Sequence, residues 1–316
     1  MTPTLDTVCF GALDTVVTPD LVFFGQTRPA AAITMGAVKG NPITKTIISL
    51  CETVYVDDSN VGSIKDGRSL ATAYNTITGA RNYVNANAGT NPTMPWVIVI
   101  APGTYTETDY VRFDNVTRVW TAANNLTIKS LYADVDSMPV WKSLSIWMML
   151  EINSEDYITI EGIQFRGNNI SATNKPWGIY VKNDADNIIV RRCLFLSCGA
   201  DTLCYGVNVE QGWGYTVAAD SLVIENCIFY GCKIAGIQNK IATANYTFWG
   251  HKYVNNTFYK CGYAWMCDAE VIHADDFLFA NNIIVSPTSG YGLYGGWNSA
   301  CNLTFRHCVC NASFIK

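Results

Sequence analysis

The chain has 316 residues, of which 49% are hydrophobic and 15% charged, with a formal net charge of −5. A chain this apolar can bury a large core, which excludes intrinsic disorder as its main description. The 21 Lys and Arg residues form no clusters, so the sequence offers no basic surface for a nucleic-acid backbone. No apolar run approaches the roughly 20 residues that a membrane-spanning helix needs. We therefore expect a soluble protein without nucleic-acid or membrane partners.

Residues 1–50 are rich in Thr, Val, Ala and Pro and contain no repeat. Their first ten residues lack the basic start and continuous apolar stretch of a classical signal peptide, so we expect no export by that route. We interpret this segment as an extended arm or docking element that needs a partner surface. The alternative is that it packs along the rest of its own chain. The residues predicted to mediate assembly here are Leu21, Phe23 and Phe24.

Residues 51–107 predict a strand, a helical stretch and a second strand. The helical stretch runs over about 68–87, and the apolar sequence at 96–100 is typical of a buried strand that ends in the turn Pro102-Gly103. Four apolar residues fall at helical spacing and are expected to cover an open sheet edge. These are Leu70, Ala73, Ile77 and Ala80.

Seven segments between residues 125 and 310 share one pattern: a turn residue, an alternating strand, two polar residues and a second alternating strand. The first inward residue of the second strand serves as a reference position and recurs at intervals of 25 to 34 residues. The residue two further on and the residue three before are also predicted to point inward. This spacing fits one turn of a parallel β-helix and is too short for a propeller blade. The reference residues are Leu131, Ile163, Cys193, Cys227, Thr257, Ile283 and Cys308.

The same alignment accounts for much of the content of twelve cysteines. Cys193, Cys227 and Cys308 share the reference column, and Cys198, Cys232 and Cys261 follow it by four or five residues. Buried free cysteine behaves as a small hydrophobe, so we favour stacked internal thiols over disulfides. No cysteine pair has the ligand spacing of a zinc site, and we predict no metal.

The opening of the predicted β-helix carries a more specific signal. Val54-Tyr-Val-Asp-Asp58, then Gly67-Arg-Ser-Leu-Ala-Thr-Ala73, then Trp96-Val-Ile-Val-Ile-Ala-Pro-Gly-Thr-Tyr-Thr-Glu107 resembles the opening of pectin-lyase-like parallel β-helix proteins. The resemblance covers about residues 51–316 and implies a right-handed, all-β solenoid with an N-terminal capping helix. It implies no single function, because that superfamily includes lyases, hydrolases, viral tailspikes and non-catalytic surface proteins.

Carboxylate pairs are the candidates for catalysis, since two carboxyl groups a short distance apart can cleave a glycosidic bond. The alternative catalytic set that we keep is Asp184, Asp186 and Arg191, to which a lyase-type reaction would add calcium. The repeat favours a structural interpretation, in which Asp156, Asp186, Asp220 and Asp276 are turn residues that bond their own backbone. The other pairs are Asp268 with Glu270 and Asp275 with Asp276. The histidines predicted to be surface or turn residues are His251, His273 and His307.

Four tryptophans lie in the variable loops, where the strand pattern does not demand burial. Exposed aromatic faces suit sugar rings or protein partners. The alternative is that these side chains pack back onto the solenoid. The tryptophans are Trp177, Trp213, Trp249 and Trp297.

We predict a non-enzymatic structural or decoration protein of a virion, such as a phage head or tail, located on the virion or another extracellular surface. Its partners would be other structural subunits, held through residues 1–50 and through an uncapped last coil that contains Phe305 and Phe314. The alternatives are a polysaccharide-cleaving enzyme of tailspike type and a glycan-binding adhesin or filament subunit. No cofactor is predicted.

Overall fold

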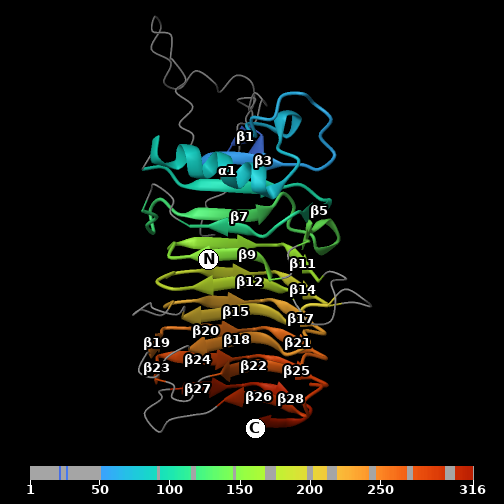
Figure 1. Cartoon of the computed structure of the whole chain (residues 1–316), viewed down its shortest axis with the longest axis vertical. Helices are drawn as coiled ribbons and strands as arrows, with labels where there is room; N and C mark the ends of the chain where they lie inside the picture. Colours follow the sequence, from blue (N-terminus) through green and yellow to red (C-terminus); the bar gives the residue numbers. More distant parts are fainter. Residues whose placement is uncertain are drawn as a thin grey trace, which may run out of the picture.

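The computed structural model describes residues 21–22, 26–27, 51–90, 93–114, 119–144, 147–167, 176–197, 202–211, 219–241, 247–268, 273–295 and 303–315. Within these residues three parallel β-sheets stack turn upon turn along one axis, with a helix at one end (Figure 1). The predicted parallel β-helix is therefore confirmed. The predicted arm lies outside the described residues except for the antiparallel pair β1 (Leu21–Val22) and β2 (Gln26–Thr27).

Each turn contributes one strand to each sheet, so strands that are neighbours in space are one turn apart in sequence. Sheet 1 has nine strands: β3 (Glu52–Val56), β4 (Trp96–Ile100), β7 (Leu126–Ser130), β10 (Ile158–Glu161), β13 (Ile189–Arg191), β16 (Val223–Glu225), β20 (Lys252–Val254), β24 (Phe277–Ala280) and β27 (Leu303–Arg306). Sheet 2 has eight: β5 (Thr104–Glu107), β8 (Val140–Ser143), β11 (Gln164–Arg166), β14 (Leu194–Leu196), β17 (Ile228–Tyr230), β21 (Thr257–Tyr259), β25 (Ile283–Val285) and β28 (Val309–Cys310).

Sheet 3 closes each turn. Its eight strands are β6 (Val111–Phe113), β9 (Met148–Asn153), β12 (Trp177–Lys182), β15 (Tyr205–Gln211), β18 (Ala235–Ile241), β22 (Tyr263–Asp268), β26 (Tyr291–Gly295) and β29 (Ser313–Ile315). A small parallel pair, β19 (Thr247–Trp249) with β23 (His273–Asp275), lies at the corner between sheets 3 and 1. No helix among the described residues is long and apolar enough to cross a membrane.

Aromatic rings stacked in register form the centre of the core. Trp141, Phe165, Phe195, Phe229 and Phe258 occupy one inward column of sheet 2. The distances between successive ring centroids are 5.4, 5.1, 4.7 and 4.8 Å, close to the strand spacing of roughly 4.8 Å. The strand spacing thus sets the ring stacking.

The predicted reference column is correct at Ile163, Cys193 and Cys227 and wrong in three other turns. Buried Asn256 and Asn282 replace Thr257 and Ile283, and the Ile283 side chain is 47% exposed. The hydrophobic pattern missed these amides because each is buried with its hydrogen bonds made. Cys227 N donates to Asn256 Oδ1 (2.9 Å), and Asn256 Nδ2 donates to Ile224 O (2.9 Å).

The first turn of that alignment is also displaced. Leu131 was predicted to be inward, but it packs against the separate cluster of Cys51, Val97 and Val99. The residue that pairs with Phe165 is Trp141, because a 3-10 turn, η4 (Val135–Ser137), separates sheets 1 and 2 in this turn. The alignment predicted that Ala133, two residues after Leu131, would hold this inward position. The longer connection places Trp141 there instead, eight residues further along the chain.

The capping helix α1 (Ile77–Asn87) begins later than predicted. Residues 70–72 form only a 3-10 turn, η2 (Leu70–Thr72), and Leu70 is 40% exposed, so its predicted role in covering the core is wrong. The buried residues that cover the first turn are Ala73, Ile77, Ala80, Val84 and Ala88, the last in η3 (Ala88–Thr90). The helix supplies the apolar face that the pattern predicted, but it starts at Ile77.

A buried carboxylate fixes the start of α1. Glu107 Oε1 accepts a hydrogen bond from Ile77 N (2.7 Å), and Glu107 Oε2 accepts one from Thr78 Oγ1 (2.5 Å). A negative charge at a helix N-terminus satisfies free N–H groups and the helix dipole. In the same opening segment, Tyr105 Oη donates to Ala101 O (2.8 Å). The residues that carry the superfamily resemblance therefore hold the cap on the first turn.

Nine cysteines lie in the described part of the chain and none of them forms a disulfide there, as the repeat predicts. Burial raises the pKa of Cys227 well above its ordinary value, with Cys193 contributing as its hydrogen-bond neighbour. His251 was predicted to be a surface or turn residue, and this is wrong. It is fully buried, with Nε2 2.9 Å from Ala219 O and Nδ1 3.2 Å from Tyr253 Oη.

Candidate functional site

A ladder of aspartates runs along the corner where sheet 3 passes into sheet 1. Asp186 N donates to Asp156 Oδ1 (2.8 Å), Asp220 N donates to Asp186 Oδ1 (2.7 Å), and Trp249 N donates to Asp220 Oδ1 (2.8 Å). We call Asp156, Asp186 and Asp220 the aspartate ladder. The aspartates were predicted to bond the backbone of their own turn, and this partner is wrong. Each carboxylate bonds the backbone of the next turn and thereby ties successive turns together.

The residue after each of the three ladder aspartates has a left-handed backbone, as do the equivalent residues of the next two turns. Tyr157, Asn187, Ser221, Gly250 and Asp276 have φ between 51° and 66°. Asp276 therefore aligns with Asn187 in the fold, and its predicted equivalence to Asp186 is wrong. This conformation turns the chain sharply into sheet 1 and places the same five residues in one row down the corner.

These five residues line a groove of about 430 Å³, which we call the corner groove. Ile189, Val223 and Lys252, from neighbouring strands of sheet 1, and the indole of Trp249 complete its lining. The groove therefore has an apolar floor, aromatic rings and hydroxyl, amide and charged groups in one strip. Its volume falls in the range typical of small-molecule sites.

Trp249 is exposed yet firmly positioned. Its side chain is 56% exposed. Its N–H is held by Asp220, its carbonyl accepts a hydrogen bond from Ser221 N (2.7 Å), and its strand β19 pairs with β23 at Asp275. These contacts fix the backbone of Trp249, so the point from which the exposed indole projects over the groove is fixed as well.

The aspartate ladder is electrostatically strained. Burial, together with the charges of Asp220, Asp156 and Asp184, raises the pKa of Asp186 to about 6, although the N–H of Asp220 lowers it. Burial raises the pKa of Asp156 and Asp220 as well, and the charge of Asp184 adds to both effects. Asp186 is therefore partly protonated just below neutral pH.

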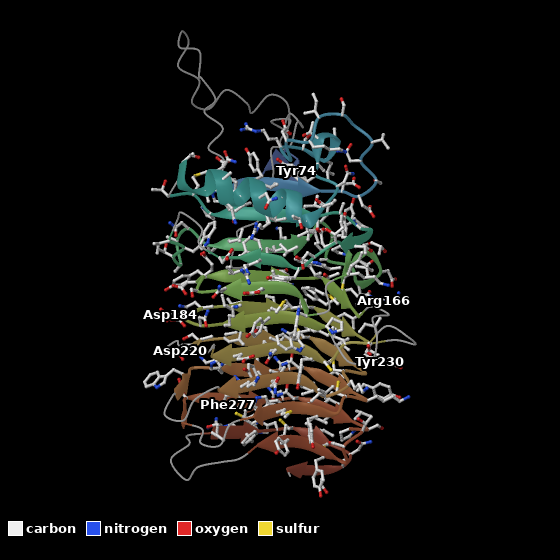
Figure 2. The ribbon with its side chains drawn as sticks, in the orientation of Figure 1. Tyr74, Arg166, Asp184, Asp220, Tyr230 and Phe277 are labelled. Atoms are coloured by element: carbon white, nitrogen blue, oxygen red, sulfur yellow. The ribbon has the colours of Figure 1, made fainter. Side chains whose placement is uncertain are left out.

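The alternative catalytic set is only partly brought together. Asp184 is exposed and lies on the same edge of the helix as Asp220 (Figure 2). Arg191 lies on the outer face of sheet 1, where its Nη2 is 2.8 Å from Glu161 Oε2, and Arg192 pairs with the same carboxylate. Among the described residues, Arg191 is therefore paired with Glu161 and not with Asp184 or Asp186. Of the predicted set, Asp184 and Asp186 are thus the two whose charges interact.

A second polar row lies on the outer face of sheet 3 and was not predicted. Glu151 is paired with Lys182 (Nζ to Oε1, 2.7 Å) and Arg112 (Nη2 to Oε2, 3.2 Å), and Tyr180 Oη donates to Glu210 (3.1 Å). Glu151, Tyr180 and Glu210 are buried. With its carboxylates already engaged and little exposed, this row is best explained as bracing between strands.

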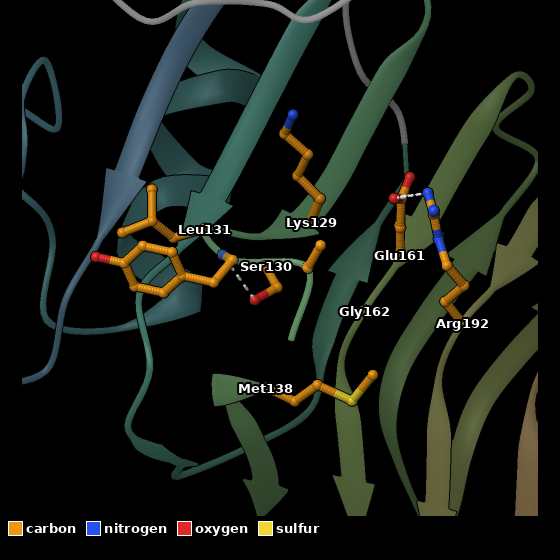
Figure 3. A pocket seen from close by; sticks show the side chains of 9 residues that line it. Lys129, Ser130, Leu131, Met138, Glu161, Gly162 and Arg192 are labelled. Atoms are coloured by element: carbon orange, nitrogen blue, oxygen red, sulfur yellow. Dashed lines mark hydrogen bonds and ion pairs between the residues drawn. The ribbon is translucent and has the colours of Figure 1, made fainter. Parts of the chain in front are cut away.

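A smaller hollow of about 150 Å³ lies between sheet 1 and the turn after β7 (Figure 3). Its lining includes Lys129, Leu131, Met138 and the ion pair of Glu161 with Arg192. This volume is below the range of typical ligand sites, and its one carboxylate, Glu161, is already paired with Arg192. The corner groove is therefore the better candidate.

The other predicted contact residues divide into two groups. Trp177 packs edge-on against Tyr180, with ring centroids 4.8 Å apart, as the packing alternative predicts. Trp213, Trp297, Phe23 and Phe24 lie outside the described residues, as do the side chains of Leu21 and Phe314. Phe305 packs partly buried against the core. Among the described residues no cluster of His, Cys, Asp and Glu is arranged to hold a metal ion.

The sequence contains a signal for the groove that the prediction did not use. Tyr157, Asn187, Ser221 and Asp276 are the turn residues that open the shared pattern in their repeats, and Gly250 holds this position in the turn between Ser221 and Asp276. Residues recurring at one turn position of a solenoid must line up on its surface. That rule predicts a row along the corner, although not that the row is hollowed.

No family model matches the sequence, and no curated protein matches it. Among solved structures, an alginate lyase from Paenibacillus sp. str. FPU-7 matches with a TM-score of 0.42 and 15% identity, covering 74% of this chain and 95% of the lyase. A rhamnogalacturonan lyase matches with a TM-score of 0.40 and 10% identity, over 82% of this chain and 62% of that one. A pectin methylesterase from Aspergillus niger matches with a TM-score of 0.40 and 16% identity, covering 84% and 85%. Likeness at this level concerns the β-helix fold and carries no argument about reaction or substrate.

Proposed function

We propose that the protein binds an extended polysaccharide in the corner groove. The observation that carries the proposal is the exposed, backbone-fixed indole of Trp249 at the edge of a groove that spans five successive turns. Sugar rings present an apolar face to aromatic side chains and hydroxyl groups to amides, hydroxyls and charges. Trp249 and Tyr157 offer the first kind of contact, and Asn187, Ser221 and Asp276 offer the second.

The regular repeat supports a polymeric ligand. Adjacent turns are separated by roughly 4.8 Å, so equivalent lining residues recur along the groove at the strand spacing. A ligand made of repeated units can contact several turns at once, and its affinity grows with the number of units bound. A longer oligosaccharide should therefore bind more tightly than a short one until the five turns are filled.

Trp249→Ala tests the proposal by calorimetry or array binding with the full chain. Loss of the stacking surface should weaken binding of a glycan ligand roughly 10- to 30-fold, about 1.4–2 kcal/mol. Trp147→Ala is the matched control, because Trp147 is 53% exposed and does not line the groove. Equal affinities for the wild-type protein and Trp249→Ala would refute the proposed site.

Cleavage of the bound chain is the finer form of this proposal, since Asp186 combines a raised pKa with a neighbouring carboxylate, Asp184. New reducing ends or unsaturated uronate absorbance, lost in both Asp184→Ala and Asp186→Ala, would support an enzyme. Binding without such products would support a glycan-binding adhesin or filament subunit.

The structural role on a virion or other extracellular surface is a second candidate. The observation that favours it lies on the outer face of sheet 2, where Ile228, Ile283 and Val309 are 46%, 47% and 64% exposed in one column that Thr257 interrupts. Exposed apolar surface of this kind is typical of contacts between subunits. Ile283→Lys should then abolish incorporation into the particle while leaving the monomer folded, and unchanged incorporation would count against this role.

A further inference from the structure

The corner groove is surrounded by an excess of negative charge. Asp276 lines it, and the aspartate ladder directly precedes three of its lining residues in the chain. The exposed Asp184 lies on the same edge of the β-helix as Asp220 (Figure 2). Its charge raises the pKa of all three ladder residues. Against these five carboxylates, Lys252 is the cation among the described lining residues.

Other cations close in sequence are already engaged. Arg191 and Arg192 both pair with Glu161 on the outer face of sheet 1, and Lys182 pairs with Glu151 on sheet 3. These ion pairs hold the cationic groups at Glu161 and Glu151, to the side of the groove. The charged groups that line the groove or adjoin it in the chain are therefore mostly aspartates.

From this charge distribution, and resting on the proposed polysaccharide-binding function, we infer that the corner groove selects its ligand by charge. It takes an amino-sugar polysaccharide in preference to a neutral one and rejects polyuronates. The carboxylate of a uronic acid would approach Asp276 in the groove and the aspartates that adjoin it, with Lys252 as the cation among the described lining residues. An ammonium group on the sugar would instead pair with Asp276 or Asp184. Repulsion between like charges, as between the uronate and these aspartates, is one way in which a binding site rejects the wrong ligand.

The test compares three oligosaccharides that share one β-1,4-linked gluco backbone and one length. The first carries 2-amino groups, the second only hydroxyls and the third C6 carboxylates. Affinities of the full chain are measured at neutral pH and low salt. The amino-sugar oligomer should bind roughly tenfold more tightly than the neutral one, and the uronate oligomer roughly tenfold more weakly. Raising the ionic strength to the physiological range shortens the screening length from about 30 to 8 Å and should narrow both differences.

Variants locate the effect in the groove. Asp184→Asn and Asp276→Asn should each reduce the preference for the amino-sugar over the uronate oligomer roughly threefold. Asp136→Asn, an exposed change away from the groove, should leave that preference unchanged. If glycans bind but the uronate oligomer binds best, the charge inference fails while the polysaccharide site stands. If no glycan on this backbone or on a broad array binds, or if binding survives Trp249→Ala, the proposed function itself fails.

Discussion

Replacing Asp186 by Asn should make the protein more stable at neutral pH and leave its stability in acid unchanged. The folded state holds the pKa of Asp186 at about 6, against an ordinary value of 3.8. The folded state therefore binds the proton more tightly than the unfolded chain does. This contribution to stability is fully present below pH 3.8 and is lost as the pH rises through about 6. The asparagine reproduces the protonated form and keeps an oxygen for the N–H of Asp220 (2.7 Å).

The size of the effect follows from the two pKa values. A difference of about 2 corresponds to about 3 kcal/mol at most. Because Asp186 is only partly buried, solvent screening reduces the expected gain of Asp186→Asn at pH 7 to about 1 kcal/mol. For a chain of this length, that gain raises the unfolding temperature by about 1–2 °C.

The measurement is the thermal unfolding midpoint of the wild-type protein and Asp186→Asn between pH 4 and pH 8. The difference should be close to zero at pH 4, open through pH 6 and reach its limit by pH 8. Asp136→Asn, at an exposed position, should show no such trend. A constant difference across the range, or a carboxyl resonance of Asp186 that titrates near pH 4, would refute the reasoning.

Three further changes probe other parts of the structure. Glu107→Ala should lower the free energy of unfolding by about 2–4 kcal/mol, because α1 loses the carboxylate that accepts a hydrogen bond from Ile77 N. Hydrogen exchange of the amides in α1 should accelerate, and unchanged exchange would contradict this role of Glu107. Gly206→Ala should lower the free energy of unfolding in denaturant by about 1–3 kcal/mol, because the new Cβ would lie 2.5 Å from the ring of Phe229. A variant as stable as the wild type would show that Phe229 can move to make room for the Cβ. Burial lowers the pKa of His251 to about 4, so the wild-type protein should lose up to about 3 kcal/mol as the pH falls from 6.5 to 4. That loss should disappear in His251→Gln, and an identical acid limb in the variant would refute this assignment.

The repeat in the sequence was enough to predict the β-helix, the capping helix and most of the interior columns, since strand alternation and turn spacing are local properties of the chain. It failed where a buried residue was polar. Asn256 and Asn282 appear outward in a hydrophobic pattern, yet they are inside because their amides bond the backbone of adjacent turns. It failed again at Leu131, where an inserted turn moved the register.

The candidate site shows the same division. The sequence identified Trp249 as an aromatic residue outside the interior columns and the aspartates as turn residues, because both follow from their positions in the repeat. It placed Trp249 in a loop, whereas this residue ends strand β19. Only the tertiary structure determined that Asp186 bonds the N–H of Asp220, that its pKa rises to about 6, and that five turn residues line one groove. These properties depend on burial and on contacts between residues some 30 positions apart, which the winding of the solenoid brings within hydrogen-bond distance.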